Sequence, residues 1–214
     1  MATLADVRYS IQAGADAVGF VCAKPTSIRT IDINSVKPIA SVVQPPKETF
    51  LLTTEATAQA ISEKVLLAGV TTVQILSYLS PQEYQKLRTL LPGKKLVQVV
   101  NIESGSAIDF IETHTPYVEA FLLDSGKPSL TTPEYGGTGR IHDWSLSAEF
   151  VRKCIHPVYL AGGLTPENVG EAIRVVRPFG VDLCTGVRTN NNLDKNKLRR
   201  FIDAVHKVDA DHND

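Results

Sequence analysis

The chain has 214 residues, of which 43% are hydrophobic and 21% are charged, and its formal net charge is -1. This composition excludes a disordered chain, and the balanced charge gives no electrostatic basis for binding nucleic acid or an anionic membrane. The cysteines Cys22, Cys154 and Cys184 have no CxxC spacing, which indicates a reducing compartment and no disulfide framework. We therefore expect one cytoplasmic domain over residues 1–214, with no signal peptide and no membrane span.

Short apolar runs alternate with helical patterns along almost the whole chain, and the first predicted element is a helix over Leu4–Ala13. The seven predicted strands are Ala17–Val21, Thr49–Thr53, Thr72–Leu76, Leu96–Val100, Ala120–Leu123, Val158–Ala161 and Val181–Cys184. The remaining predicted helices are Ser35–Val43, Glu55–Leu67, Pro81–Leu91, Ser106–Glu112, Ser145–Lys153, Pro166–Val176 and Lys195–His206. Most of the strands are continuously apolar, which is typical of parallel strands covered by helices.

This alternation predicts right-handed strand–helix–strand units in a parallel sheet, either an open doubly wound sheet or a closed barrel. A (β/α)8 barrel needs eight strands, each followed by a helix, whereas seven strands are predicted here and a helix comes first. One strand before Leu4 would complete the count. We therefore expect a TIM (β/α)8-type barrel that lacks its first strand. Its open edge would be covered by the amino-terminal segment, a rearranged sheet or a second copy in a homodimer.

Glycine turns follow the last two predicted strands, with Gly162 and Gly163 after one and Thr185 and Gly186 after the other. Backbone N–H groups in such turns bind anions at the carboxyl ends of barrel strands, helped by helix dipoles. Either turn alone is as well explained by an ordinary loop between a strand and a helix. Their joint placement favours a phosphate-binding site.

Asp124 ends a predicted strand, where a carboxyl group serves as a general acid or base, or simply caps the following loop. The long segment 125–143 contains Gly136-Gly137-Thr138-Gly139 and is either a functional loop or a flexible surface loop. The five histidines have no metal-ligand spacing, so we expect neither a metal site nor a cofactor.

Several segments, taken together in their order and spacing, resemble the phosphoribosylanthranilate isomerase family of tryptophan biosynthesis. The matching segments are 13–21 (AGADAVGFV), 27–29 (SIR), 73–74 (VQ), 122–125 (LLDS), 136–139 (GGTG), 143–144 (DW), 160–169 (LAGGLTPENV), 176–182 (VRPFGVD) and 185–187 (TGV). The resemblance implies an Amadori rearrangement of an aminoribose phosphate to a ketose, without metal or organic cofactor. It covers nearly the whole chain.

The resemblance also implies roles for individual residues. Asp124 matches the family's general acid, and Arg29 matches the residue that faces the anthranilate carboxylate. The substrate-binding residues that it implies are Arg29, Gly137 and Asp182, and the phosphate-binding residues are Gly162, Gly163, Thr185 and Gly186. The expected partner is therefore a small phosphorylated molecule.

The chain departs from the family pattern where the family has its catalytic base, a cysteine at the end of the first strand. Aligned through the segment 13–21, the sequence begins where that motif has ended. A histidine and a lysine of the family pattern are replaced by Leu76 and Gln98. Cys184, and less directly Cys22, are candidates for a substitute base, although cysteine is more often a small buried residue.

Two hypotheses follow from this departure. In the first, the chain is an isomerase whose true start lies upstream and restores the missing strand. In the second, it is a divergent, non-catalytic relative that binds a phosphorylated sugar or a related metabolite. For the chain as written, we expect turnover too slow to measure, because a general base contributes roughly 10²–10⁴-fold to such reactions.

Overall fold

The structure is a computed structural model, and it describes residues 1, 3–102, 105–126 and 142–211. In these residues seven parallel strands follow one another in the order β1 to β7. Their bounds are β1 Ala17–Val21, β2 Glu48–Thr53, β3 Thr72–Ile75, β4 Lys95–Asn101, β5 Ala120–Asp124, β6 Val158–Leu160 and β7 Gly180–Val181. The helices are α1 Leu4–Ala13, α2 Val36–Ala40, α3 Ala58–Ala68, α4 Pro81–Leu90, α5 Asp109–His114, α6 Trp144–Lys153, α7 Val169–Val176 and α8 Lys195–Asp211.

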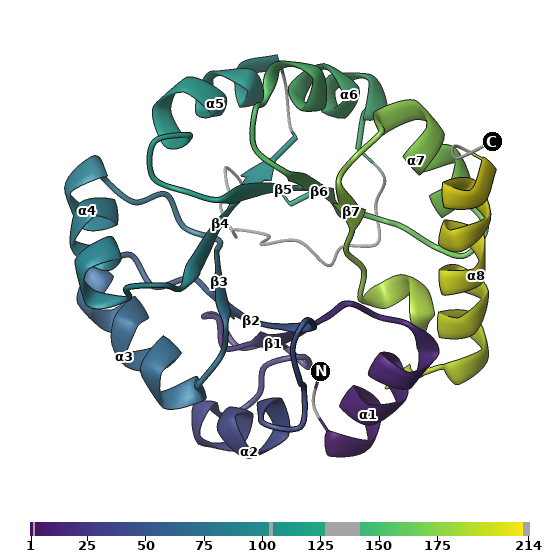
Figure 1. The fold of residues 1–214 in the computed structure, drawn as a ribbon, viewed down its shortest axis with the longest axis horizontal. Coiled ribbons are helices and arrows are strands. Elements are labelled where there is room, and N and C mark those ends of the chain that lie inside the picture. Colours follow the sequence, from purple (N-terminus) through teal and green to yellow (C-terminus); the bar gives the residue numbers. More distant parts are fainter. Residues whose placement is uncertain (2, 103–104, 127–141, 212–214) are drawn as a thin grey trace. The chain divides into compact units, whose positions relative to one another are not determined.

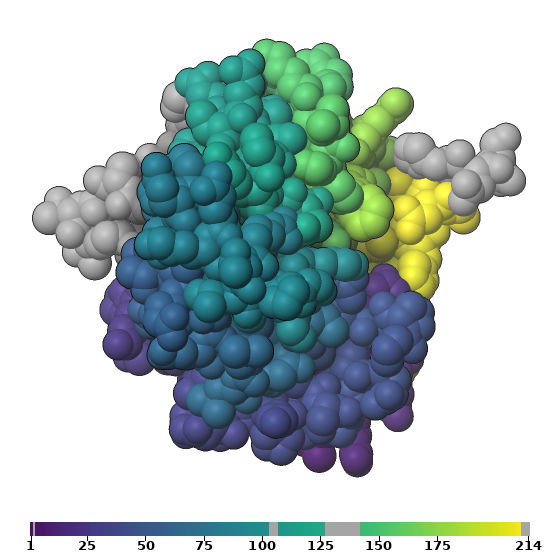
Figure 2. Space-filling model, turned by 60° about the vertical axis from the view of Figure 1, so that its left-hand side comes forward, coloured from purple at the N-terminus to yellow at the C-terminus, as the bar shows by residue number. Residues whose placement is uncertain are grey.

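The chain divides into two compact units, Met1–Gln98 with Tyr117–Glu119, and Val99–Pro116 with Ala120–Asp214. In the first unit, β1 to β4 pair in chain order, with Val18 opposite Thr49 and Leu51 opposite Val73. Helices α2, α3 and α4 lie along one face of these strands (Figure 1). Every residue of β3 is buried. Figure 2 shows the outer surface of this unit in purple and blue.

Capping residues explain why the helices of the first unit begin where they do. The side chains of Thr3, Thr57 and Ser80 each accept a hydrogen bond from a backbone N–H in the first turn of α1, α3 and α4. Gly14 and Gly69 end α1 and α3 in the left-handed region, with φ of 115° and 66°. These are the residue types that the two ends of a helix prefer.

The outer edge of β1 is partly covered by its own unit. The Met1 ammonium donates a hydrogen bond to the Gly19 carbonyl, and Ile31 N donates to the Val21 carbonyl over 2.9 Å. No further strand of the described part of the chain flanks β1 or β7, which are the two ends of the strand order. The expected seven parallel strands and eight α-helices are confirmed for the described residues.

In the second unit, the segment after β4 meets β5, because Ile102 N donates to the Asp124 carbonyl over 3.0 Å. Strand β5 pairs with β6, and β6 pairs with β7, all in parallel. The rings of Phe121 on β5 and Phe150 on α6 meet edge to face, with 5.4 Å between their centroids. Helices α6 and α7 lie outside these strands (Figure 1).

Several boundaries in this unit differ from the sequence prediction, and two of them bear on the site. The last strand was expected over Val181–Cys184, but β7 covers only Gly180–Val181. Its neighbour β6 ends at Leu160, so the residues after β7 have no strand to pair with there. The helix expected from Pro166 begins at Val169. None of the described helices combines the length and the apolar character needed to cross a bilayer.

A short antiparallel hairpin, absent from the sequence prediction, links the site region to α8. Its strands are β8 Arg188–Thr189 and β9 Asn192–Leu193, and the two residues between them, Asn190 and Asn191, have φ of 49° and 63°. Two positive φ values are what a tight two-residue hairpin turn requires, and asparagine tolerates them better than most residues.

Candidate active site

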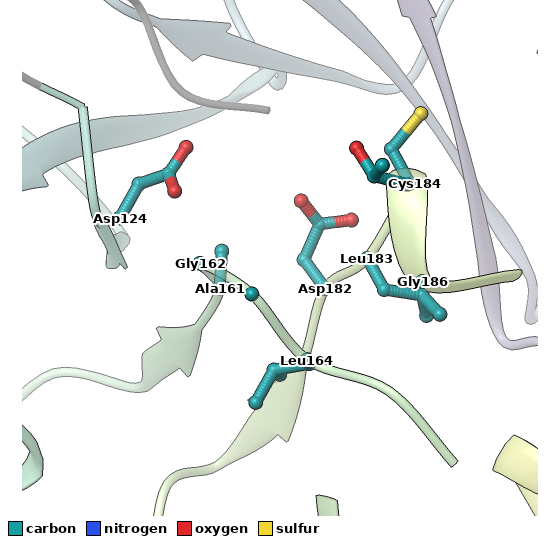
Figure 3. Close-up of a pocket in the computed structure, with 10 residues that line it drawn as sticks. Asp124, Ala161, Gly162, Leu164, Asp182, Leu183, Cys184 and Gly186 are labelled. Atoms are coloured by element: carbon teal, nitrogen blue, oxygen red, sulfur yellow. The ribbon is translucent and has the colours of Figure 1, made fainter. Parts of the chain in front are cut away.

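A pocket lies in the second unit, at the carboxyl ends of β5, β6 and β7 (Figure 3). Its volume is about 60 Å³, which is room for a few water-sized groups. The lining residues are Asp124, Ala161, Gly162, Gly163, Leu164, Asp182, Leu183, Cys184, Thr185 and Gly186. The structure thus brings together the carboxyl groups, both glycine turns and the cysteine that the sequence placed after three separate strands.

The first glycine turn needs glycine for two reasons. Gly162 and Gly163 have φ of 84° and 65°, a conformation that residues with a Cβ rarely adopt. A Cβ on Gly162 would also lie 2.9 Å from His142 Nδ1 and 3.0 Å from Ser125 N. The turn is therefore closely packed on one side, and its other side lines the pocket.

Asn168 holds this turn in shape. Its Nδ2 donates to the Gly163 carbonyl over 3.0 Å, and its Oδ1 accepts from Thr165 N over 2.8 Å. One side chain thus satisfies two backbone groups on either side of Leu164. Sequence reasoning assigned no role to Asn168. An asparagine three residues after Thr165, beside the turn, was the available signal.

Gly186 of the second glycine turn packs directly against the backbone that follows the first turn. A Cβ built on Gly186 would lie 2.0 Å from the Leu164 carbonyl oxygen and 3.2 Å from Thr165 Cα, so no other residue fits without moving the backbone. The segment Thr185–Val187 forms a single 3-10 turn. Because α7 begins only at Val169, the residues next to this pocket belong to the two turns and not to the first turn of a helix that starts at Pro166.

Asp124 is the last residue of β5, and its carboxyl group points into the pocket (Figure 3). Oδ1 accepts a hydrogen bond from Ser125 N over 2.7 Å. Burial raises the pKa of Asp124 above its ordinary value, and the hydrogen bonds from Ser125 offset part of that rise. A carboxyl group held in this way is suited to donate a proton.

Asp182 follows β7 directly, and its backbone N–H donates to the Leu160 carbonyl over 2.8 Å. Burial of the carboxyl group, followed by the charge of Asp124, raises the pKa of Asp182 to about 6. The carboxyl group is surrounded by protein atoms, but the residue as a whole still has exposed surface and lines the pocket, so a small molecule there can reach it. Asp182 is therefore both reachable and partly protonated near neutral pH.

The three cysteines differ in their surroundings. Cys184 lines the pocket, and the close-up shows its sulfur directed away from the Asp182 carboxyl group (Figure 3). Its backbone leaves the strand conformation at φ -138° and ψ -63°. Cys22, in the first unit, donates from Sγ to the Ile31 carbonyl at 3.4 Å, and burial raises the pKa of its thiol. Burial likewise raises the pKa of Cys154, the residue that follows α6.

His142 is a neighbour of the site that sequence reasoning missed. Its Nε2 pairs with Ser147 Oγ at 2.7 Å, and its buried Nδ1 faces Gly162 with no hydrogen-bond partner in the described part of the chain. Burial lowers the pKa of His142 to about 4, so the ring is neutral at pH 7. The only sequence signal was its position one residue before the Asp143 cap of α6.

The remaining predicted residues lie elsewhere. Arg29 is half-buried in a turn of the first unit, where its backbone N–H donates to Ser27 Oγ over 3.2 Å. Gly137 lies outside the described residues. Gln98, which replaces the family's lysine, is fully buried, accepts a hydrogen bond from the Tyr84 hydroxyl and donates to the Ser77 carbonyl over 3.2 Å. Its amide therefore serves the packing of α4 on the sheet.

Comparison with known proteins gives a consistent result. The family model for N-(5'-phosphoribosyl)anthranilate isomerase matches residues 1–204. A protein of Methanosarcina mazei named N-(5'-phosphoribosyl)anthranilate isomerase 2 is 36% identical over 207 residues, which are 96% of this chain and 90% of that protein. The isomerase of Neisseria gonorrhoeae is 35% identical over 204 residues, with 95% of this chain and 92% of that protein covered.

Solved structures agree with this fold. The Thermus thermophilus phosphoribosyl anthranilate isomerase superposes with a TM-score of 0.82 at 22% identity, and covers 97% of this chain and 96% of its own. A phosphoribosyl anthranilate isomerase in complex with reduced 1-(o-carboxyphenylamino)-1-deoxyribulose 5-phosphate superposes with a TM-score of 0.75 at 25% identity. The superposition covers 97% of this chain and 95% of that chain. The expected TIM-barrel fold class is thereby confirmed.

Proposed function

Since the chain belongs to the N-(5'-phosphoribosyl)anthranilate isomerase family, we propose that the pocket of its second unit is where the family's reaction takes place. That reaction is the Amadori rearrangement of N-(5'-phosphoribosyl)anthranilate in tryptophan biosynthesis. It opens the furanose ring and moves a proton from the sugar's second carbon, so it needs an acid, a base and a grip on the phosphate. The observation that carries the assignment is the convergence of Asp124 with two interlocked glycine turns in one pocket.

Asp124 is the acid in this proposal. Its position at the end of β5 directs the carboxyl group into the pocket, and burial raises its pKa toward the range in which a carboxyl group donates a proton at working pH. The sugar ring oxygen receives that proton as the ring opens.

The glycine turns are the phosphate cradle. Gly163, Thr185 and Gly186 line the pocket, and we assign the phosphate to their backbone N–H groups and to the Thr185 hydroxyl. The two hydrogen bonds of Asn168 keep the first turn rigid. A rigid, prearranged set of donors binds an anion more tightly, because no conformational entropy is lost in ordering the loop on binding. Gly162 contributes by allowing close approach of His142 and Ser125, which fixes the base of the turn.

The rest of the substrate reaches beyond this pocket, which is too small to enclose a phosphoribosyl anthranilate. We assign the anthranilate carboxylate to Arg29 and a substrate-binding role to Gly137, on the family resemblance alone. We further propose a cytoplasmic location and a homodimer. One related structure is described as monomers generated from a dimeric isomerase of Thermotoga maritima.

Calorimetric titration of the protein with inorganic phosphate and with ribose 5-phosphate tests the cradle. We expect binding in the micromolar to millimolar range, loss of binding in Gly163→Ala, and unchanged binding in Gly93→Ala. Gly93 is the matched control because it also has a positive φ, 76°, but a Cβ there would meet nothing within 4 Å. Equal loss in both variants, or no binding to the parent protein at millimolar phosphate, contradicts the cradle.

A fluorescence assay that follows consumption of phosphoribosylanthranilate tests the reaction itself. Turnover by the parent protein and its loss in Asp124→Asn support the proposal. Phosphate binding without any turnover would instead favour a non-catalytic sugar-phosphate binder.

A further inference from the structure

Two carboxyl groups enter the same pocket from neighbouring parts of the second unit. Asp124 comes from the end of β5 and Asp182 from the end of β7, and the close-up shows both carboxyl groups directed into one space (Figure 3). None of the ten lining residues is a lysine, arginine or histidine. Burial and the charge of Asp124 raise the pKa of Asp182 by more than the charge of the Met1 ammonium lowers it. Two carboxyl groups in one pocket therefore resist ionising together, and one of them keeps its proton to a higher pH than an ordinary aspartic acid.

We propose that Asp182 is a second catalytic residue, which shares a single proton with Asp124 and delivers it to the ring oxygen of the bound sugar. This inference rests on the proposed function, and it adds a residue that the family resemblance assigned only to substrate binding. The pair, and not Asp124 alone, is then the acid.

The electrostatics of the pocket agree with a shared proton. Burial raises the pKa of both groups, and the charge of Asp124 further raises the pKa of Asp182, to about 6. Of the other titratable groups in this unit, Cys184 lines the pocket, and His142 lies behind Gly162 as a neutral ring. With a pKa of about 6 the pair keeps a shared proton in about half of the molecules at pH 6 and in about one in ten at pH 7, and its apparent pKa values belong to both residues together.

The proton balance of the reaction fits such a pair. In the first step the shared proton moves to the ring oxygen, the bond between that oxygen and the first carbon breaks, and the anilino nitrogen lone pair forms a C=N bond. Both carboxyl groups are then ionised, which makes the pair a stronger base. In the second step it accepts the proton from the second carbon, the C–H electrons form the C=C bond of the enolamine, and the π electrons of the C=N bond return to the nitrogen as its lone pair.

The pair ends this step with one proton, as it began. The enolamine becomes the ketone by moving its hydroxyl proton to the first carbon through solvent. No oxidant, metal or other co-reactant is consumed.

The magnitude of the effect follows from the fraction of protonated acid. A group with a pKa of about 6 is protonated in about one molecule in ten at pH 7, whereas an ordinary aspartic acid is protonated in about one in a thousand. If Asp182 supports the acid in this way, Asp182→Asn lowers kcat/KM at pH 7 by about 100-fold. The alkaline limb of the pH profile, where activity is lost as the general acid deprotonates, moves to lower pH at the same time.

The test combines carbon-13 NMR titration of aspartate-labelled protein with steady-state kinetics. The parent protein is compared with Asp182→Asn, Asp124→Asn and the control Asp16→Asn, which changes a fully solvent-exposed carboxyl group in the first unit. We expect the pKa of Asp124 to fall in Asp182→Asn and the pKa of Asp182 to fall in Asp124→Asn. In Asp16→Asn both should stay at their parent values.

Two results would overturn the pair. One is a pKa of Asp124 that is unchanged in Asp182→Asn, together with a kcat within threefold of the parent value and a raised KM, which assigns Asp182 to binding only. The other is full activity in Asp182→Asn with loss in Cys184→Ser. Failure of the proposed function looks different, because the parent protein then turns over no substrate while the reciprocal pKa shifts still report on the pair.

Discussion

Replacing Asp182 with asparagine should stabilise the folded protein at neutral pH. The folded-state pKa of Asp182, about 6, lies above the ordinary value of 3.8, so the fold binds the proton more tightly than the unfolded chain does. Stability is therefore lost as the pH rises from about 4 to about 6, and the ionised carboxyl group opposes folding above that range. Two pKa units correspond to about 3 kcal/mol, and solvent that reaches the exposed side chain reduces this to about 1–2 kcal/mol.

Asparagine keeps the size and one acceptor oxygen of the side chain but carries no charge. For a protein of this length, the gain corresponds to a rise in Tm of about 2–8 °C at pH 7.5. Urea unfolding of parent and variant at several pH values between 7.5 and 4.5 measures it, and the gain should shrink steadily as the pH falls. A variant that is less stable than the parent, or a gain that does not depend on pH, would refute this electrostatic account. Asp16→Asn should show no gain.

Three further changes test the packing around the pocket. Gly186→Ala should cost about 1–3 kcal/mol in chemical unfolding and abolish the phosphate-induced rise in Tm, since its Cβ would meet the Leu164 carbonyl, whereas Gly170→Ala should be tolerated. Asn168→Ala should weaken phosphate binding by calorimetry about tenfold, because the first turn loses two hydrogen bonds. Because the pKa of His142 is lowered to about 4 in the folded protein, the parent should lose about 3 kcal/mol of its free energy of unfolding as the pH falls from 6.5 to 4. His142→Phe should remove this loss.

Local signals were sufficient for most of the fold. The expected bounds of the first helix and the first strand match α1 and β1, because a threonine cap, a terminal glycine and a β-branched run mark them unambiguously. The last strand was predicted too long because its apolar residues continue past the point where β6 offers hydrogen-bond partners. The hairpin of β8 and β9 was missed although Asn190 and Asn191 are a recognisable turn pair.

The site was predictable in its members but not in its construction. Residues at the carboxyl ends of parallel strands gather at one edge, so Asp124 and the glycine turns could be placed together from the sequence. The contact of Gly186 with the Leu164 carbonyl and the approach of His142 to Gly162 join segments far apart in sequence. No local pattern encodes such contacts. The same holds for the effect of Asp124 on Asp182, which depends on burial and on the distance between two strands.

A crystal structure of this chain with reduced 1-(o-carboxyphenylamino)-1-deoxyribulose 5-phosphate, the compound bound in a related isomerase, tests the central claim most directly. The account predicts that the phosphate accepts hydrogen bonds from the backbone N–H groups around Gly163 and Gly186. It also predicts that the first two carbons of the sugar chain lie within reach of both Asp124 and Asp182. A phosphate bound elsewhere, or a sugar that contacts neither carboxyl group, would contradict it.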